Sequence, residues 1–242
     1  MSRAGAIIIG NEVLSGKVEE ENARFLIREL RGLGVKLERI VFLRDEVEEI
    51  ATEVRRMSAA YDHVFTSGGV GTTHDDVTFL GVARAFGREL RLEPRLEALL
   101  AARFGDKMND VVRRMAHVPE GAELLYARPD RFPVLAVENV FVLPGVPLFF
   151  RAKFEEVLRA RLGGPAFVLR QVYVSVPEDE IAVHLEQVQR AHPDLELGSY
   201  PRFDDADHRV RLTVEGRDGA RVEAGFRALL GGLPPAWVVR SE

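Results

Sequence analysis

Strand and helix patterns alternate through the first 66 residues of this 242-residue chain. The apolar run 4–9 ends at Gly10 and predicts a strand buried on both faces. The predicted elements that follow are a helix over 20–33, a strand over 36–43, a helix over 47–54 and a strand over 63–66. This βαβαβ order predicts an α/β fold in which a mostly parallel sheet forms the middle of three αβα layers.

The segment after residue 78 predicts further helices and one hairpin. Helical periodicity returns over 78–86, after Pro94 and over 108–117. Two apolar segments, 134–137 and 140–143, are separated by Glu138-Asn139, which predicts an antiparallel pair added to the sheet. A last helix is expected to end near Leu162, before the predicted linker Gly163-Gly164-Pro165.

The remainder of the chain predicts a second, smaller domain. Its elements are expected at 168–176, 178–190, 195–203, 209–215, 221–230 and 237–240, in the ferredoxin-like order βαββαβ. The predicted domains are therefore 1–164 and 165–242. Between two of these strands lie Asp204, Asp205, Asp207 and His208, which we interpret as a solvated turn and not as a metal site.

Composition excludes several classes of function. The chain has no cysteine, so thiol catalysis, cysteine-ligated zinc and disulfides are excluded. Its net charge is −5 and its basic residues are scattered, so we expect no nucleic-acid partner. No apolar run approaches the roughly 18 residues of a membrane span, and no signal peptide precedes residue 10, so we expect no membrane association and a cytoplasmic location.

The strongest local signal is the segment 67–78, which follows a strand and precedes a helix. It contains three glycines that allow close backbone approach to a ligand, and its free N–H groups suit a phosphate or pyrophosphate. It is neither a Walker A loop nor a dinucleotide fingerprint. The candidate phosphate-binding residues are Ser67, Gly68, Gly69, Gly71, Thr72, Thr73 and Thr78.

Asp75 and Asp76 in this segment have two interpretations that the spacing leaves equally open. Thr73-x-x-Asp76 approximates a capping box at the start of a helix. Two adjacent carboxylates beside a phosphate-binding loop also suit a Mg²⁺-type ion shared with substrate phosphates.

Polar residues follow the other predicted strands as well. They are Gly10, Asn11, Glu12 and Gly16 after the first strand, Asn22 in the first turn of the next helix, Asp45 after the second strand, and the loop Pro144-Gly145-Val146-Pro147. Taken singly, each favours a structural role in a turn or cap. Because all of them are expected at one edge of the sheet, where α/β folds bind ligands, together they predict a binding site.

These motifs, in this order, resemble the MoaB/Mog-type molybdopterin-binding domain. The resemblance rests on Gly10-Asn11-Glu12-x-Leu14-x-Gly16, Glu20-x-Asn22, Asp45, Gly68-Gly69-x-Gly71-x-Thr73-x-Asp75-Asp76-x-Thr78 and Leu143-Pro144-Gly145-Val146-Pro147. Within that superfamily the chain is most similar to the N-terminal regions of the CinA family and of eukaryotic FAD synthase. The segment Leu197-Gly198-Ser199-Tyr200-Pro201 extends the likeness into the small domain. Three positions depart from the usual pattern: Thr72 replaces proline, and Glu20 and Asn11 replace Asp.

The resemblance implies a function and a set of site roles. Asp45 and Asp76 would be catalytic, Asp75 and Asp76 would hold a divalent metal (Mg, Mn, Co or Ni), and the 67–78 loop, with the other residues named above, would bind the ligand. The implied activity is a metal-dependent pyrophosphatase acting on a nucleotide cofactor of the ADP-ribose or FAD class. The alternative is a protein of molybdenum-cofactor biosynthesis that binds or adenylylates molybdopterin or a nucleotide. A homo-oligomer, dimer or trimer, is expected in either case.

Overall fold

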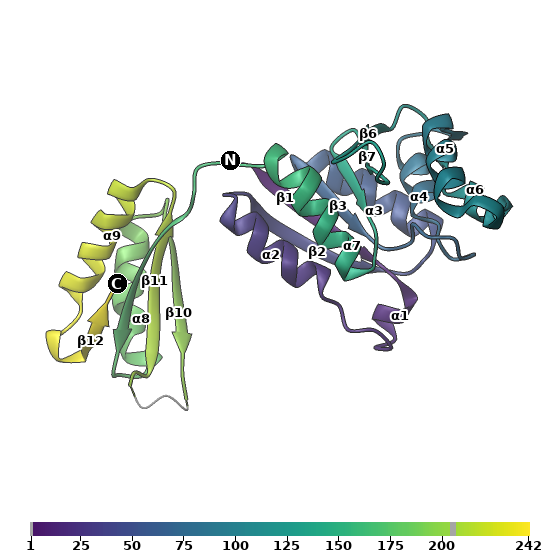
Figure 1. The fold of residues 1–242 in the computed structure, drawn as a ribbon. Helices are drawn as coiled ribbons and strands as arrows, with labels where there is room; N and C mark the ends of the chain where they lie inside the picture. Colours follow the sequence, from purple (N-terminus) through teal and green to yellow (C-terminus); the bar gives the residue numbers. More distant parts are fainter. Residues whose placement is uncertain (1, 204–206) are drawn as a thin grey trace. The chain divides into compact units, whose positions relative to one another are not determined.

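The computed structural model describes residues 2–203 and 207–242, and the chain divides into two compact units, Met1–Gly164 and Pro165–Glu242 (Figure 1). Each unit has its own buried apolar core. Asp204 and Asp205, which the sequence places in a turn, lie outside the described residues.

A six-stranded sheet forms the middle of the first unit, in the order β2-β1-β3-β8-β7-β6. Neighbouring strands are parallel from β2 to β8, and β7 is antiparallel to both of its neighbours. The predicted mostly parallel α/β sheet is therefore confirmed. The strands are β1 (Arg3–Ile9), β2 (Lys36–Leu43), β3 (His63–Ser67), β6 (Glu123–Leu125), β7 (Val134–Val137) and β8 (Val140–Leu143).

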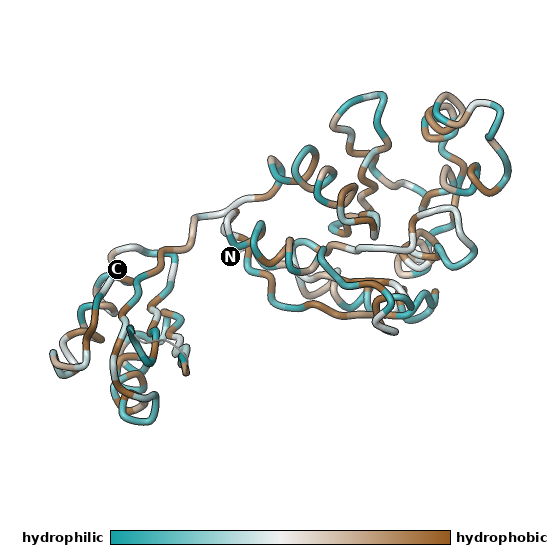
Figure 2. The backbone as a smooth tube through the Cα atoms, turned by 60° about the horizontal axis from the view of Figure 1, so that its bottom comes forward, coloured by the Kyte–Doolittle hydropathy of each residue, from teal (hydrophilic) through white to brown (hydrophobic). Residues whose placement is uncertain are grey.

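Helices cover both faces of this sheet and complete the three layers. One face packs against α2 and α7 through Phe25 and Phe150, and the other against α3 and α4 through Ile50 and Val82. Hydrophobic and hydrophilic residues alternate along these helices, as expected of helices with one buried face (Figure 2). The helices are α1 (Asn11–Leu14), α2 (Asn22–Gly32), α3 (Val47–Ala60), α4 (Thr78–Ala85), α5 (Pro94–Phe104), α6 (Asp110–Arg114) and α7 (Pro147–Lys153).

The structure differs from the sequence-based expectation in several short elements. The segment after β1 forms the one-turn helix α1 where only a turn was expected. The predicted helix over 108–117 shortens to α6, because its end joins a two-stranded sheet of β4 (Leu90–Leu92) and β5 (His117–Pro119). The last helix continues from α7 through a π-helical turn (Phe154–Leu158) and a 3-10 turn (Arg159–Arg161). Elements of three residues are too short for periodicity to reveal.

The second unit has the predicted βαββαβ order. Its antiparallel sheet is arranged β10-β11-β9-β12, which is the ferredoxin-like arrangement. Trp237 is partly buried and packs against this unit's core. The elements are β9 (Val168–Val174), α8 (Glu178–Ala191), β10 (Glu196–Pro201), β11 (Val210–Gly216), α9 (Gly219–Gly232) and β12 (Val238–Ser241). Across residues 2–203 and 207–242, no helix combines the length and apolar character needed to cross a bilayer.

Candidate functional site

The carboxyl ends of β1, β2, β3 and β8 meet at one edge of the first unit's sheet, because these four strands are parallel neighbours. Gly10, Asp45, Gly68 and Pro144 each follow one of these strands within two residues. The structure therefore brings the four predicted segments to the same edge, which is where open α/β sheets bind ligands.

The start of the 67–78 loop depends on two glycines that approach other backbone closely. Gly68 has φ +103°, and a Cβ built there would lie 2.1 Å from the carbonyl oxygen of Ile9. A Cβ on Gly145 would lie 3.2 Å from the Cα of Gly68. The end of β1 and the loops after β3 and β8 therefore pack together at this point, and only glycine fits at position 68.

Thr78 anchors the other end of the loop. Its hydroxyl donates to the carbonyl of Gly68 at 2.8 Å, and its backbone N–H donates to the carbonyl of Gly69 at 3.0 Å. A Cβ on Gly69, whose φ is +63°, would lie 2.3 Å from the Thr78 hydroxyl oxygen. Thr78 is fully buried, so these bonds hold the loop against the first turn of α4.

The helix α4 begins at Thr78, as the periodicity predicts, but Asp75 and Asp76 lie in the turn ahead of it and not at the helix start where they were expected. Asp76 Oδ2 accepts hydrogen bonds from the backbone N–H of Thr73, at 2.6 Å, and from the Thr73 hydroxyl. The backbone N–H of Asp76 donates to the Thr73 carbonyl at 3.3 Å. Thr73 and Asp76 thus pair partly as in a capping box, but their hydrogen bonds lie within the 67–78 loop and close that loop. The hydrogen bonds of the described residues use only one oxygen of Asp76, Oδ2.

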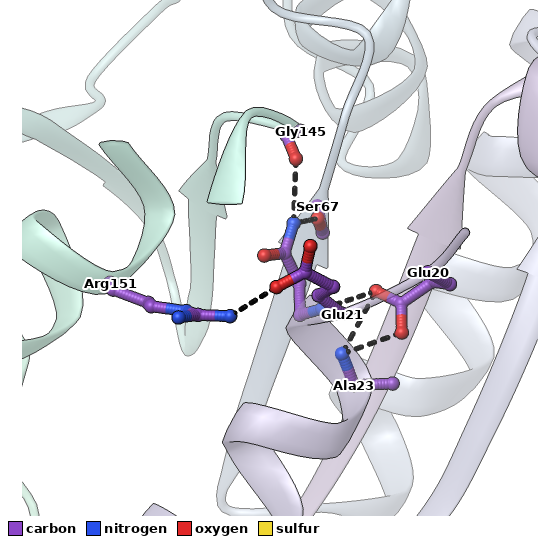
Figure 3. Close-up of polar contacts among 7 residues, drawn as sticks. Glu20, Glu21, Ala23, Ser67, Gly145 and Arg151 are labelled. Atoms are coloured by element: carbon purple, nitrogen blue, oxygen red, sulfur yellow. Dashed lines mark hydrogen bonds and ion pairs between the residues drawn. The ribbon is translucent and has the colours of Figure 1, made fainter. Parts of the chain in front are cut away.

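Asn22 joins three segments at this edge. Its side-chain amide nitrogen donates to the Ser67 hydroxyl at 2.9 Å and to the Gly145 carbonyl at 2.7 Å (Figure 3). Asn22 is 3% exposed, and its Oδ1 is buried with no hydrogen-bond partner among the described residues. Buried acceptors of this kind are rare in folded proteins and call for an explanation. Asn22 therefore links the end of β3 to the loop after β8. Its Oδ1 remains an acceptor without a donor among the described residues.

The acidic residues before Asn22 have structural partners. Glu20 Oε1 accepts from the backbone N–H groups of Asn22, at 2.7 Å, and Ala23, at 2.9 Å, so its carboxylate caps α2 (Figure 3). Glu21 forms an ion pair with Arg151 of α7. Glu20, whose side chain is longer than that of the usual Asp, therefore caps α2.

Asp45 lies beside the other carboxylates of the edge. Its Oδ2 accepts from the backbone N–H of Asn11 at 2.8 Å, and it does not cap α3. Partial burial raises the pKa of the Asp45 carboxyl, although the Asn11 bond acts in the opposite direction. The negative charges of Glu12, Asp75 and Asp76 raise this pKa further. Asp45 therefore lies within electrostatic range of these three carboxylates.

The carboxylates of this region do not form a complete metal site on their own. Within residues 2–203 and 207–242, no group of three or more His, Cys, Asp or Glu side chains is placed to hold a metal ion. Mg²⁺-type ions are commonly held by one or two carboxylates together with substrate phosphates. The oxygen donors of Asp45, Asp75 and Asp76 fit such a shared arrangement.

The remaining predicted residues lie at the border of the site. Gly16 has φ +72° in an exposed turn, and a Cβ there would meet nothing within 4 Å. Pro147 is the first residue of α7 and Pro144 directly follows β8, so both shape the loop around Gly145. Thr72 is partly exposed in the middle of the 67–78 loop.

An apolar pocket of about 310 Å³ adjoins this edge, and no sequence pattern predicts it. Its walls include Val70, Phe79 and Pro144, which lie within or next to the predicted site segments. Lys153 of α7 also contributes to the wall, and its ammonium donates to the backbone carbonyls of Phe132 and Pro133. The lining comes from segments far apart in the chain, so only the folded structure reveals it. The one feature of the sequence that could have drawn attention to this wall is Lys153, because the chain has only four lysines.

Comparison with known proteins identifies relatives of both units. Residues 5–164 match the family described as the probable molybdopterin binding domain, and residues 166–242 match the middle domain of FAD synthase. A protein from Archaeoglobus fulgidus is 38% identical over 221 residues, which cover 91% of this chain and 93% of the relative. A probable FAD synthase from Caenorhabditis briggsae is 32% identical over 249 residues, which cover 91% of this chain but 47% of the relative. The chain thus spans about half the length of that FAD synthase.

A solved structure also resembles the first unit. The crystal structure of CinA from Thermoplasma acidophilum superposes with a TM-score of 0.58 and 29% sequence identity, covering 64% of this chain and 95% of CinA. Together with the family matches, this confirms the resemblance to MoaB/Mog-type, CinA and FAD synthase proteins that the sequence motifs predicted.

Proposed function

The chain belongs to the family of the probable molybdopterin binding domain, and we propose that it is a metal-dependent pyrophosphatase that hydrolyses a nucleotide cofactor of the ADP-ribose or FAD class. The FAD synthase middle domain in its second unit and the likeness to a probable FAD synthase support a nucleotide cofactor as the ligand. The likeness to CinA supports the same branch of the family.

One observation carries the proposal: a glycine loop suited to phosphates and the carboxylates of Asp45, Asp75 and Asp76 occupy the same edge of the sheet. The loop starts at Gly68 and is tied to α4 by Thr78. Asp45 is close enough to Asp75 and Asp76 for their charges to raise its pKa. Carboxylates placed beside a pyrophosphate are repelled by it unless a cation lies between them. The arrangement therefore suits an anionic ligand bound together with a divalent ion.

The chain's own residues would act on the pyrophosphate in two ways. Backbone N–H groups of the 67–78 loop would hold the phosphate oxygens and stabilise the negative charge that increases during attack. Whichever carboxylate of Asp45 and Asp75 does not hold the metal would orient a water molecule and accept its proton. The water oxygen then forms a bond to one phosphorus, the bridging P–O bond breaks, and AMP and the second phosphate ester leave.

The metal would be held by Asp76 together with Asp75 or Asp45. When bound, it would polarise a phosphoryl oxygen and neutralise charge on the leaving group. Glu12 and Asn22 would position the rest of the ligand, Asn22 through its buried, unpartnered Oδ1.

The proposal is tested by measuring AMP release from ADP-ribose and from FAD in the presence of Mg²⁺, Mn²⁺, Co²⁺ or Ni²⁺. We expect metal-dependent release that falls by about a hundredfold or more in Asp76→Asn, as is typical when one stabilising group of an active site is lost. Asp106→Asn changes an exposed aspartate in the turn after α5 and should leave the rate unchanged.

Two results would contradict the proposal. Full activity in a folded Asp76→Asn protein would exclude the assigned site. Saturable ligand binding without AMP release under any of the four metals would favour the alternative, a molybdopterin or nucleotide binding or adenylylating protein.

A further inference from the structure

We propose that the apolar pocket beside the 67–78 loop binds a flat heteroaromatic ring of the nucleotide whose pyrophosphate lies on that loop. The inference rests on the proposed function, which it extends by assigning a second subsite. The volume of the pocket, about 310 Å³, is at the lower end of the range of small-molecule pockets, about 300–1,000 Å³.

The pocket and the loop share walls. Val70 lies between Gly69 and Gly71 of the loop, Phe79 follows the loop anchor Thr78, and Pro144 precedes Gly145. A ligand whose phosphates contact the loop therefore has the pocket immediately beside it. This shared boundary makes the two features parts of one site.

The lining has the chemistry of a ring-binding site. Aromatic side chains come from Phe79, Phe104, Phe132 and Phe149, which belong to four separate segments. Aromatic rings bury large apolar areas and favour offset or edge-to-face contact with another ring. A sugar or a bare phosphate would leave these walls without a complementary surface. The lining therefore favours a heteroaromatic ring over the other parts of a nucleotide.

Cations stand at the border of the pocket. Arg103 and Arg131 are exposed lining residues, and neither forms an ion pair within the part of the chain that the structure describes. Guanidinium groups stack on aromatic faces and also bind phosphate oxygens. Lys153, in contrast, is engaged with the carbonyls of Phe132 and Pro133, so it stabilises the wall. The two arginines thus suit a ligand that combines a ring with negative charge.

The test narrows the pocket mouth at Ala127, an exposed loop residue that lines it. Dissociation constants are measured by calorimetry for ADP, FMN and inorganic pyrophosphate with the full chain and Mg²⁺. We expect Ala127→Trp to weaken binding of ADP or FMN by about tenfold or more, while pyrophosphate binding stays the same. The matched control Ala101→Trp changes an exposed α5 residue outside the pocket and should leave all three constants unchanged. The probe that loses affinity, ADP or FMN, identifies the ring as adenine or isoalloxazine.

Three outcomes would overturn the inference. They are unchanged affinity of Ala127→Trp for both ring-bearing probes, an equal loss for all three probes, and no binding of either ring-bearing probe to the unmodified chain. Because the readout is binding, it is separate from AMP release. A protein that binds ADP or FMN in the pocket but releases no AMP would refute the proposed hydrolysis and retain the ring subsite.

Discussion

Asn22 shows how one side chain can hold separate segments of the sheet edge together. Its amide nitrogen uses both protons, one on the Ser67 hydroxyl and one on the Gly145 carbonyl. Its other polar atom, Oδ1, is buried without a partner among the residues described. Leaving a buried polar group unpaired costs about 1–3 kcal/mol. A ligand group that donates to Oδ1 would recover part of this free energy on binding.

We predict that Asn22→Ala lowers the free energy of unfolding by about 1–3 kcal/mol, because the Gly145 carbonyl and the Ser67 hydroxyl lose their shared donor. Urea denaturation measures the change. Glu21→Ala at the neighbouring position removes only an exposed ion pair with Arg151 and should cost about 0–1 kcal/mol. Equal losses in the two variants would show that the Asn22 contacts contribute no special stability.

Lys153 is a second residue whose surroundings change its chemistry. Burial lowers the pKa of its ammonium group to about 8, although the negative charge of Glu156 acts in the opposite direction. Above that pH the folded protein has released a proton that the unfolded chain still binds. The free energy of unfolding therefore increases with pH between about pH 8 and the ordinary pKa of lysine.

The resulting prediction concerns stability between pH 7.5 and pH 9.5. The unmodified chain should gain about 1–2 kcal/mol more than Lys153→Met across this interval. Lys107→Met, at an exposed position, should keep the same pH dependence as the unmodified chain. Parallel curves for Lys153→Met and the unmodified chain, from denaturation at both pH values, would show that Lys153 titrates normally.

At the scale of elements, the 67–78 loop is shaped by its contacts with other strands. Gly68 meets the end of β1, Gly145 meets Gly68, and Thr78 ties the loop to α4. For this reason α4 starts at Thr78, and the turn through Asp75 and Asp76 remains outside the helix. The position of the carboxylates follows from the packing of the loop.

Gly68 and Gly16 both have positive φ, so alanine at each position tests whether the close packing of the 67–78 loop is needed for activity. Gly68→Ala places a Cβ 2.1 Å from the Ile9 carbonyl oxygen, so β1 or the loop must move, and we expect AMP release to be lost. Gly16→Ala meets no atom within 4 Å and should cost only about 1 kcal/mol of backbone strain. Rates and thermal unfolding of both variants are compared. A Gly68→Ala protein as active as Gly16→Ala would show that the close approach of the loops is not needed.

At the scale of the whole molecule, the two units have separate cores. The buried clusters of the first unit are made by residues up to Leu162, and that of the second unit begins at Val172. The family matches divide the chain at nearly the same place, between residues 164 and 166. All the proposed site residues belong to the first unit.

We therefore predict that residues 1–164 fold alone and release AMP at the rate of the full chain, because their core and their site are both internal to that fragment. Calorimetry and the AMP assay check folding and activity separately. A folded fragment without activity would show that the second unit contributes to catalysis or ligand binding.

The sequence alone determined the order of the main elements and the family. Local periodicity and glycine or proline breaks predicted β1 to β3, the hairpin of β7 and β8, the linker at 163–165 and the βαββαβ second unit. These features depend on neighbouring residues, which is why a single sequence reveals them. The family followed from motifs that stand in a fixed order along the chain.

Only the tertiary structure decided which of these residues meet. Asn22 reaches Ser67 and Gly145, which are 45 and 123 residues away, and Asp45 accepts from Asn11, 34 residues away. The pocket wall likewise combines residues from Val70 to Val157. Such contacts arise because parallel strands bring the carboxyl ends of distant segments to one edge. Sequence periodicity carries no record of that proximity, so it could indicate the edge but not the bonds made there.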